Sequence, residues 1–507
     1  MIFKHLYDTS LSQSSYFIGC QATGEAVVVD PLRDVDQYIE LAEREGMRIA
    51  AVTETHIHAD YCSGARELAF RSGGQLFLSG CGSPEWRYSY AAADRATELE
   101  AGDVVGIGEV RLTVVHTPGH TPEHICFLVT DGAVSARPMG MLTGDFLFVG
   151  DVGRPDLLET VVHQTGTMEA SARALYQSLQ NLRDLPDYLQ IWPGHGAGSL
   201  CGRALGAVPQ TTLGYERLVN WALQPQTEDE FVAAVLRDQP EPPAYFAVMK
   251  QINRDGPTLL GSLPDIPHRS GFEAQQYVEK LGLLIDARPA ADFAEAHIRG
   301  SVNIPGNASF ASWFGSLVDY GTNTWLLAVD ERDGERLVRS LMSIGYDRIV
   351  GVSVASDALI GVDADTVAQR SAVALSGALG RDGLLVVDVR TDREWATGHI
   401  PGAVHIPLAQ LPHRLQELPA DGTLVTQCAS GGRSAIAASL LLMAGASSVE
   451  NLSGGIQAWT NAGLALTTEE TPVATVDQAA VEVDKRAGGD GAGGEIPRFL
   501  DRRTRER

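Results

Sequence analysis

Four hydrophobic runs in the first part of the chain each stop at a His or Asp flanked by Gly or Pro, and this pattern constrains the fold more than any other feature. The runs are Ile49–Val52, Val110–Val115, Gly140–Thr143 and Tyr188–Trp192, and the segments after them are THIHAD, HTPGHT, GD and PGHG. Such runs are typical of buried strands. Strand ends hold side chains rigidly, and glycine lets backbone approach a site closely. The pattern therefore predicts one site assembled from several strand ends.

The first of these segments indicates what that site binds. In Thr53–Gly64, which reads TETHIHADYCSG, His56, His58 and Asp60 stand at alternate positions. Imidazoles and a carboxylate that converge at the end of a strand can share one metal ion. The alternative is a polar loop with two surface histidines. Because three further segments of the same kind follow, we expect a metal centre.

Composition excludes several classes of protein. A chain of 507 residues has room for about three domains. The net charge of -25 argues against a nucleic-acid or anionic-membrane partner. No apolar run approaches the roughly 20 residues of a membrane span, and the N-terminus lacks the pattern of a signal peptide. Six scattered cysteines indicate free thiols, so we expect a cytoplasmic protein.

The motifs THIHAD, TPGHT, TGD and PGHG occur here in the order typical of metallo-β-lactamase-fold proteins, and residues 1–245 resemble that family. The resemblance implies an αββα sandwich with the metal at one edge of the packed sheets. One position departs from the family. Its hydrolases carry His-x-His-x-Asp-His and bind two metals, whereas this chain has Tyr61 at the last position. A phenol with a pKa near 10 is a poor ligand at neutral pH, so the second metal site loses a ligand.

What remains resembles the persulfide dioxygenase branch of the family. That resemblance implies one Fe(II) per chain, held by two imidazoles and one carboxylate, which is the ligand set of many non-haem iron oxygenases. The implied ligands are His56, His120 and Asp145. His58, Asp60 and His195 would surround them and orient the ligands. The implied reaction oxidises glutathione persulfide, or another small persulfide, with O2 to sulfite.

Tyr61 is a candidate for the substrate pocket, and two more residues are candidates as well. Arg154, in the segment that follows Asp145, could pair with a substrate carboxylate. An ordinary loop salt bridge is the alternative for Arg154. Cys201 follows His195 closely and could relay sulfur, although a packed thiol fits that position equally well.

The second half of the chain contains an internal repeat. LLIDAR at Leu283–Arg288, followed by HIRGSVNIP at His297–Pro305, returns as LVVDVR at Leu385–Arg390 and HIPGAVHIP at His399–Pro407. The offset is constant across these blocks, which makes chance similarity implausible. Both copies resemble rhodanese domains.

The two copies differ at the residue that would carry sulfur. In the second copy a strand over 423–427 ends at Cys428, followed by Ala429, Ser430, Gly431, Gly432 and Arg433 and then a helix. A small loop before a helix N-terminus favours a thiolate and an anionic persulfide. The Cys-x4-Arg spacing is that of sulfurtransferases, whereas the related phosphatases use Cys-x5-Arg. The first copy has Asp330 and Glu331 after its strand and no cysteine there, so we expect it to be inactive.

The sequence therefore predicts an α/β multidomain protein, an αββα sandwich followed by two α/β rhodanese-like domains. The predicted limits are 1–245 for the dioxygenase domain, 256–360 for the inactive copy, 365–466 for the active copy and 467–507 for a disordered tail. The predicted partners are glutathione persulfide, O2, sulfite, thiosulfate and glutathione; a homo-oligomer is left open. Two alternatives stay open for the activity: a dinuclear zinc hydrolase of the glyoxalase II type fused to a rhodanese, and a sensor or sulfur-relay module with a structural metal.

Overall fold

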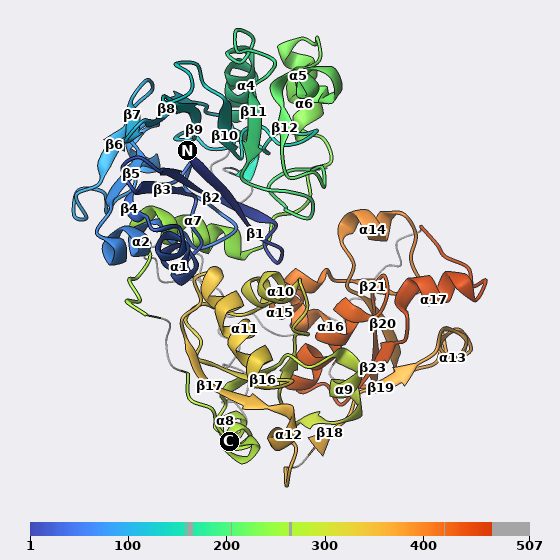
Figure 1. Ribbon diagram of the computed structural model, residues 1–507. Helices are drawn as coiled ribbons and strands as arrows, with labels where there is room; N and C mark the ends of the chain where they lie inside the picture. Colours follow the sequence, from blue (N-terminus) through green and yellow to red (C-terminus); the bar gives the residue numbers. More distant parts are fainter. Residues whose placement is uncertain are drawn as a thin grey trace, which may run out of the picture. The chain divides into compact units, whose positions relative to one another are not determined.

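The computed structural model describes residues 1–157, 159, 166–203, 205–262, 266–362, 364–419 and 421–468. The chain forms two compact units (Figure 1). The first comprises Met1–Asp265 with Arg339–Asp347, and the second comprises Ile266–Val338 with Arg348–Arg507.

The first unit is built on two six-stranded sheets with strand orders β1-β2-β3-β4-β5-β6 and β12-β11-β10-β9-β8-β7. The strands of the first sheet are β1 (Ile2–Asp8), β2 (Gln13–Cys20), β3 (Glu25–Val29), β4 (Arg48–Thr53), β5 (Gln75–Ser79) and β6 (Thr97–Leu99). Those of the second are β7 (Val104–Ile107), β8 (Val110–His116), β9 (Ile125–Asp131), β10 (Gly140–Gly144), β11 (Gln190–Pro193) and β12 (Thr211–Thr212). Strand β4 is parallel to β3, and β10 is parallel to β11.

Alternating side chains explain the layering of this unit. Along β2, Phe17 faces a core shared with helices, whereas its neighbours Tyr16 and Ile18 face the core between the two sheets. Such alternation is expected of a strand that is buried on both faces. A third core joins the outer face of the second sheet to further helices. The order helix, sheet, sheet, helix follows, and the predicted αββα sandwich is confirmed.

Helices cover both outer faces of the sandwich. The described helices of this unit include α1 (Asp36–Glu45), α2 (Ala65–Ser72), α4 (Thr167–Gln180), α5 (Leu213–Val219), α6 (Glu228–Leu236) and α7 (Tyr245–Asp255), with the short 3-10 turns η1 (Pro84–Trp86) and η2 (Trp221–Leu223). Residues of α1 and α2 pack on the first sheet, and residues of α4 and α6 pack on the second. No described helix is long and apolar enough to cross a membrane.

The second unit holds both copies of the repeat, each with its own parallel sheet, in the orders β15-β13-β16-β17 and β19-β23-β22-β20-β21. A small pair, β14-β18, lies beside them. The strands are β13 (Leu283–Asp286), β14 (His297–Ile298), β15 (Val302–Asn303), β16 (Thr324–Ala328), β17 (Ile349–Val354), β18 (Ala364–Asp365), β19 (Ala368–Arg370), β20 (Leu384–Asp388), β21 (Val404–His405), β22 (Thr423–Gln427) and β23 (Ser448–Leu452).

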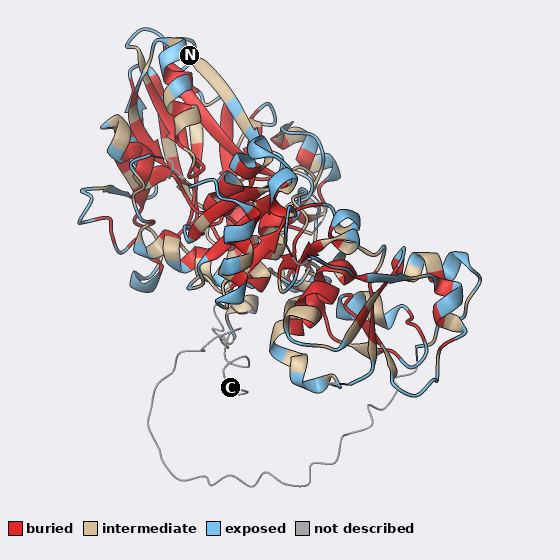
Figure 2. Ribbon diagram, turned by 90° about the horizontal axis from the view of Figure 1, so that it is seen from below, coloured by how far each residue is buried: buried red, intermediate tan, exposed pale blue. Residues whose placement is uncertain are grey.

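The helices that pack around these sheets follow the same order in the two copies. They are α8 (Gly271–Glu279), α9 (Ala290–Glu295), α10 (Phe310–Leu317), α11 (Glu331–Ser343), α12 (Ala355–Ala358), α13 (Ala372–Ser376), α14 (Asp392–Ala396), α15 (Leu411–Arg414), α16 (Gly432–Met443) and α17 (Gly455–Asn461). Figure 2 shows the sheet strands coloured largely as buried, with exposed residues concentrated on the helices and loops around them.

The repeated D-x-R motif has a structural role in both copies. Asp286 accepts hydrogen bonds from the Arg288 guanidinium at 2.6–3.1 Å, and Asp388 holds Arg390 in the same way at 2.7–3.1 Å. Each arginine also donates to a carbonyl eight residues onward. Because all four side chains are buried, these pairs satisfy one another's charges and fix the loop after the first strand of each copy.

The predicted domain limits stay predictions. Thr467 forms a bridge to His399, so the start of the predicted tail adjoins the second copy. The rest of that predicted tail, residues 469–507, lies outside the described residues.

Candidate metal centre and sulfur-transfer loop

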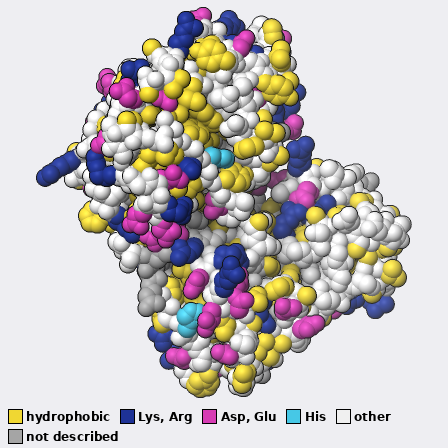
Figure 3. Space-filling view, in the orientation of Figure 1, with side chains coloured by type: hydrophobic (Ala, Val, Ile, Leu, Met, Phe, Trp, Pro, Cys, Tyr) yellow, Lys and Arg dark blue, Asp and Glu magenta, His cyan; other side chains and the backbone are white. Residues whose placement is uncertain are grey.

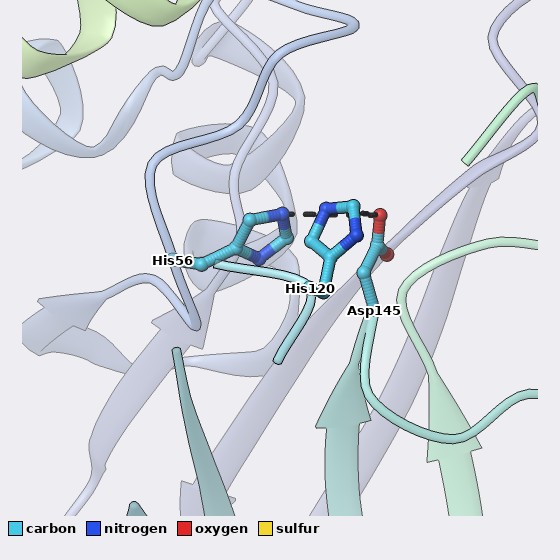
Figure 4. Close-up of side chains that lie close together, drawn as sticks. All are labelled: His56, His120 and Asp145. Carbon is cyan, nitrogen blue, oxygen red and sulfur yellow. Dashed lines mark ion pairs between the residues drawn. The ribbon is translucent and has the colours of Figure 1, made fainter. Parts of the chain in front are cut away.

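Three of the predicted ligands meet at the ends of strands from both sheets (Figure 4). His56 follows β4, His120 follows β8 and Asp145 follows β10. The Nε2 atoms of His56 and His120 lie 3.8 and 3.6 Å from the same carboxylate oxygen, Oδ2 of Asp145. All three side chains are buried. Three donor atoms at such separations suit one ion at ordinary metal–ligand distances.

The hydrogen bonds behind the two histidines set their tautomers. The backbone carbonyl of Arg154 can only accept, so His120 donates its Nδ1–H to it at 2.9 Å. The Thr55 hydroxyl donates to Asp30, which leaves its oxygen to accept the Nδ1–H of His56 at 2.9 Å. Each ring therefore presents an Nε2 lone pair toward Asp145. This arrangement fits a metal ligand, whose second ring nitrogen is held by a carbonyl or hydroxyl.

Burial also keeps both rings neutral, as metal ligands must be. It lowers the pKa of His120 to about 4 and lowers that of His56 well below its usual value. His56 Nε2 and Asp145 Oδ2 are buried and have no hydrogen-bond partner in the described part of the protein. Unsatisfied buried polar atoms are uncommon. The donor set therefore fits a single divalent ion.

The remaining polar residues of the predicted site bind one another. His195 lies between two carboxylates, with Nδ1 2.7 Å from Asp145 Oδ1 and Nε2 2.7 Å from Asp60 Oδ2. Burial would lower the pKa of His195, but Asp145 and Asp60 outweigh it and hold the pKa well above its usual value. His195 is therefore a cation that occupies one oxygen of Asp145 and leaves the other free to face His56 and His120.

His58 is not part of the three-ligand group, although its ring lies 4.2 Å from that of His56. Its Nε2 lies 3.1 Å from Asp30 Oδ1, and its ring packs on that of Tyr61 with a centroid separation of 4.4 Å. Burial opposes protonation of His58, but Asp30 outweighs it and raises the pKa. The Tyr61 hydroxyl lies 3.4 Å from the Asp30 carbonyl and 3.3 Å from Gln13 Nε2. Tyr61 thus packs between the strand β2 and the loop that carries His58.

The other two candidates for the substrate pocket lie near the metal group. Arg154 is fully buried, and its guanidinium binds Asp156 through two hydrogen bonds of 2.8 and 2.6 Å and the Leu200 carbonyl at 3.2 Å. This is the loop salt bridge that the sequence left open. Cys201 lies with Asp60 and His195 in a second group whose ligand atoms are within 4.8 Å of one another. Burial, reinforced by nearby carboxylates, raises the pKa of the Cys201 thiol well above its usual value.

Sequence reasoning missed two residues that organise the centre. His124 accepts a hydrogen bond from the Asp145 backbone N–H at 3.1 Å, and its ring stacks on His56 at 4.9 Å. Asp30 binds Thr55 and His58 and has a left-handed backbone with φ of 53°. The left-handed backbone of this non-glycine residue is not visible in the sequence. His124 was visible in the sequence as the histidine three residues after TPGHT.

The second predicted site lies in the other unit, at the end of β22. Cys428 accepts the backbone N–H of Gly431 at 3.1 Å, and its Sγ lies 3.4 Å from the Ser434 hydroxyl. Helix α16 begins at Gly432, inside the predicted loop. The first N–H groups of α17 donate to the carbonyls of Cys428 and Ala429 at 2.8 and 3.1 Å. Two helix starts therefore hold the loop, and donors point at the sulfur.

The charge of Arg433 is balanced, which the sequence did not indicate. Its guanidinium forms two hydrogen bonds of 2.6 and 2.7 Å to Glu394, which completes the capping box of α14 with the N-cap residue Thr391. The hydrogen bond from Arg433 lowers the pKa of Glu394 to about 2. The loop therefore carries an ion pair beside Cys428 instead of an isolated positive charge. Of the other loop residues, Ser430 is exposed at the rim.

The first copy lacks the cysteine at the matching position of its sheet. Asp286 pairs with Leu327 across the sheet, as Asp388 pairs with Gln427. The next residue is Ala328 in the first copy and Cys428 in the second. A methyl group at this position cannot carry sulfur, and the inactivity of this copy stays a prediction.

Charged side chains of both signs are mixed on the surface. On the face shown in Figure 3, Lys and Arg side chains are interspersed with Asp and Glu and do not form one continuous basic surface.

Comparison with known proteins places both halves of the chain. Residues 8–195 match the model of the metallo-beta-lactamase superfamily, and residues 271–353 and 371–462 match that of the rhodanese-like domain. A solved metallo-beta-lactamase from Staphylococcus aureus is 40% identical, with a TM-score of 0.63, and the match covers 70% of this chain and 98% of that one.

Two curated relatives carry different activities in their names. A hydroxyacylglutathione hydrolase of Nitrosococcus oceani is 29% identical over 53% of this chain and 93% of its own length. The mitochondrial persulfide dioxygenase ETHE1 of Homo sapiens is 28% identical over 38% of this chain and 68% of its own length. The chain therefore belongs to the metallo-beta-lactamase superfamily, has persulfide dioxygenase homologues, and carries two rhodanese-like domains after its metallo-beta-lactamase domain.

Proposed function

We propose that the protein is a persulfide dioxygenase fused to a sulfurtransferase, with one Fe(II) held by His56, His120 and Asp145. The observation that carries this proposal is the division of the polar residues into two sets. The donor atoms of His56, His120 and Asp145 lie within 4.8 Å of one another, whereas His195 Nε2 lies 2.7 Å from Asp60 Oδ2 and His58 pairs with Asp30. One ion uses the first set completely. Two imidazoles and one carboxylate leave further coordination positions open, as oxygen-activating iron sites do.

The chain's own residues have distinct tasks in this reaction. A bound Fe(II) would supply the redox chemistry toward O2, which zinc lacks. His120 and His56 are held neutral by burial and by their Nδ1 hydrogen bonds. His195 pairs with Oδ1 of Asp145 and leaves Oδ2 beside the Nε2 atoms of His56 and His120, where the three side chains would hold the ion. In the overall reaction one persulfide anion, one O2 and one water give one thiol, one sulfite and one proton.

The second site would move sulfane sulfur between carriers. The Cys428 thiolate attacks the outer sulfur of thiosulfate, the S–S bond breaks, and sulfite leaves with the electron pair of that bond. A thiol such as glutathione then takes the sulfur from the Cys428 persulfide. In the reverse direction, sulfite from the first site accepts sulfur from Cys428 and becomes thiosulfate. Fusion of the two sites raises the local concentration of the shared sulfite. We place this chemistry in the cytoplasm.

The test is O2 uptake by the iron-loaded protein given glutathione persulfide, with sulfite and thiosulfate counted at the end. We expect rapid uptake that His120→Ala abolishes and Cys428→Ser retains. A protein with one Fe(II) per chain and no uptake would contradict the proposal. His120→Ala also addresses a purely structural metal, because loss of such a metal would unfold the protein, whereas loss of a catalytic one leaves it folded.

A second candidate is a thioester hydrolase with two zinc ions. The second group of potential ligands, Asp60, His195 and Cys201, favours it, as does the similarity to a hydroxyacylglutathione hydrolase. The strong pairing of His195 with two carboxylates opposes it, because a second ion would have to displace the proton that both carboxylates stabilise. Two zinc ions per chain together with hydrolysis of S-lactoylglutathione would establish this reading and exclude the first.

A further inference from the structure

Helix α7 holds the loop that carries the candidate ligands. The Tyr245 hydroxyl donates to the Asp60 carbonyl at 3.0 Å. The Asn253 amide donates to the carbonyls of His58 and Tyr61 at 2.8 and 2.7 Å and accepts the Ser63 N–H at 2.9 Å. The buried face of α7 therefore lies directly against the segment that follows His56.

Lys250 lies on that same buried face. The buried residues of the helix are Tyr245, Phe246, Met249, Lys250 and Asn253. Lys250 is only 4% exposed, and its Nζ has no hydrogen-bond partner among the described residues. The ammonium group lies 4.7 Å from the centroid of the Trp86 ring, a contact that stabilises a cation without using its N–H groups. Fully buried lysines without a partner are rare, because an unpaired charge in a protein interior is costly.

The surroundings of Lys250 belong to the metal centre. Glu123 is the buried acid whose charge acts on Lys250, and Glu123 itself accepts the Ile57 N–H at 2.9 Å, next to His56. Within the described chain, Lys250 and Glu123 form no ion pair at 4.0 Å or less. The charge of Lys250 also acts on His120 and on Cys201. Burial lowers the pKa of Lys250 to about 8, so the group still carries a proton at pH 7.

The other cation expected to meet the substrate is already occupied. The sequence suggested Arg154 for a substrate carboxylate, but Asp156 and the Leu200 carbonyl bind its guanidinium. Lys250 is a buried cation near the candidate ligands with all three N–H donors unused in the described structure.

We propose that Lys250 is an anion-binding residue of the metal centre, whose ammonium group holds a negatively charged group of the substrate. This inference rests on the proposed function for the identity of the substrate. The bound group is either the anionic sulfur end, as in a persulfide or sulfite, or a carboxylate of the thiol that carries it. In both cases the ligand brings the hydrogen-bond acceptors that the protein does not supply to Nζ.

A structural role for Lys250 predicts a different response to mutation. Lys250→Met keeps the length and packing of the side chain and removes its charge. If the charge serves ligand binding, its removal leaves the unfolding temperature unchanged or raises it, because an unpaired buried charge disappears. In that variant Glu123 loses the positive charge of Lys250, a charge that lowers the pKa of Glu123. The neutral double variant, Glu123→Gln with Lys250→Met, therefore serves as a second test of stability.

The experiment measures binding separately from turnover. Full-length protein with Cys428→Ser, which prevents reaction of sulfite at the rhodanese loop, is titrated anaerobically with sulfite and with S-methylglutathione in a calorimeter. We expect Lys250→Met to weaken binding of one probe about tenfold or more, as for loss of a charged hydrogen bond, and Lys250→Arg to retain most of it. Loss for sulfite alone assigns the sulfur end, and loss for S-methylglutathione alone assigns the carboxylate. The matched control is Arg254→Met, which removes a partly exposed cation from the same helix.

Several outcomes would overturn the proposal. They are unchanged binding of both probes in Lys250→Met, absence of binding in the parent protein, or equal loss in Lys250→Arg together with a lower unfolding temperature. Failure of the proposed dioxygenase function gives a different result, since O2 uptake would be absent in the parent protein while the effect of Lys250→Met on binding persists.

Discussion

Replacement of Gly153 with alanine tests whether the three-ligand group depends on a close approach of two loops. A Cβ atom at Gly153 would lie 1.8 Å from the carbonyl oxygen of Asp145 and 3.2 Å from the Cβ atom of His120. The first contact involves backbone, so no side-chain rotation relieves it. The two atoms must separate by about 1.5 Å to reach an ordinary carbon–oxygen contact. Both residues in contact are candidate metal ligands.

The expected size of the effect follows from this displacement. A functional site tolerates shifts of about 0.5 Å before its geometry is lost, so the required movement is about three times that tolerance. Overpacking of this kind costs about 1–3 kcal/mol of stability. If the same strain is expressed as lost metal affinity, each 1.4 kcal/mol lowers the affinity about tenfold. We therefore expect Gly153→Ala to remain folded but to lose most of its bound iron.

The assay compares iron per chain and the unfolding temperature after dialysis against a series of chelator concentrations. Gly106→Ala is the matched control, because its added Cβ atom meets nothing within 4 Å and its backbone is not left-handed. Gly153→Ala with the iron affinity, O2 uptake and unfolding temperature of the parent protein would refute the reasoning. Equal losses in Gly106→Ala would show that the effect is not specific to the site.

Three further predictions concern the sulfur-transfer loop and its support. Ser434→Ala removes the hydroxyl 3.4 Å from the Cys428 sulfur, and we expect thiosulfate sulfurtransferase activity to fall about tenfold with O2 uptake unchanged; equal transfer rates would contradict this role. Glu394 has a folded pKa of about 2, below its unfolded value, so the stability it contributes is present above the unfolded pKa and is lost as the pH falls through about 2. Thermal unfolding of Glu394→Gln should therefore lose the difference from the parent protein between pH 5 and pH 2, and a constant difference would exclude the pair as its cause. Ser439→Ala removes the hydroxyl that accepts the buried Asn303 N–H at 3.0 Å. We expect the free energy of unfolding in urea to fall by about 1–3 kcal/mol. A change near zero would mean that the two repeat copies do not depend on this hydrogen bond.

The sequence was most informative where chemistry and secondary structure coincide. His56, His120 and Asp145 each follow a strand, and strands that end at one edge of a sandwich bring such residues together. The repeat was visible because D-x-R is a self-contained pair in each copy, with donor and acceptor two residues apart. Patterns whose residues lie close together in the chain can be recognised from the sequence alone.

Partners far apart in the chain could not be predicted. Arg433 binds Glu394 across 39 residues, and Lys250 approaches Glu123 from a helix that no motif marks. The sequence indicated no partner for Arg433 and left Arg154 open between a substrate carboxylate and a loop salt bridge, and in both cases the structure supplies a carboxylate. Burial of a lysine is equally hidden, since α7 could have turned Lys250 to solvent by a small rotation. The partners and the burial of these charged residues depend on how distant elements pack, which the sequence does not show.

The first copy of the repeat packs on a helix of the second copy, although it has no cysteine at the matching position. Helix α16 is buried continuously from Ser434 to Leu441, although a helix on the surface of a single α/β domain normally exposes one face. The first copy covers that face: α16 packs against β15 and α9, and the Asn303 N–H donates to Ser439. The first copy therefore has a packing role that does not require a cysteine. Ala328, which stands where the second copy has Cys428, does not disturb this packing. Helix α16, whose first turn faces Cys428, therefore packs against both copies. The first copy thus packs on the helix whose first turn lies against Cys428, and under the proposed function this packing would hold the sulfur-transfer loop in place.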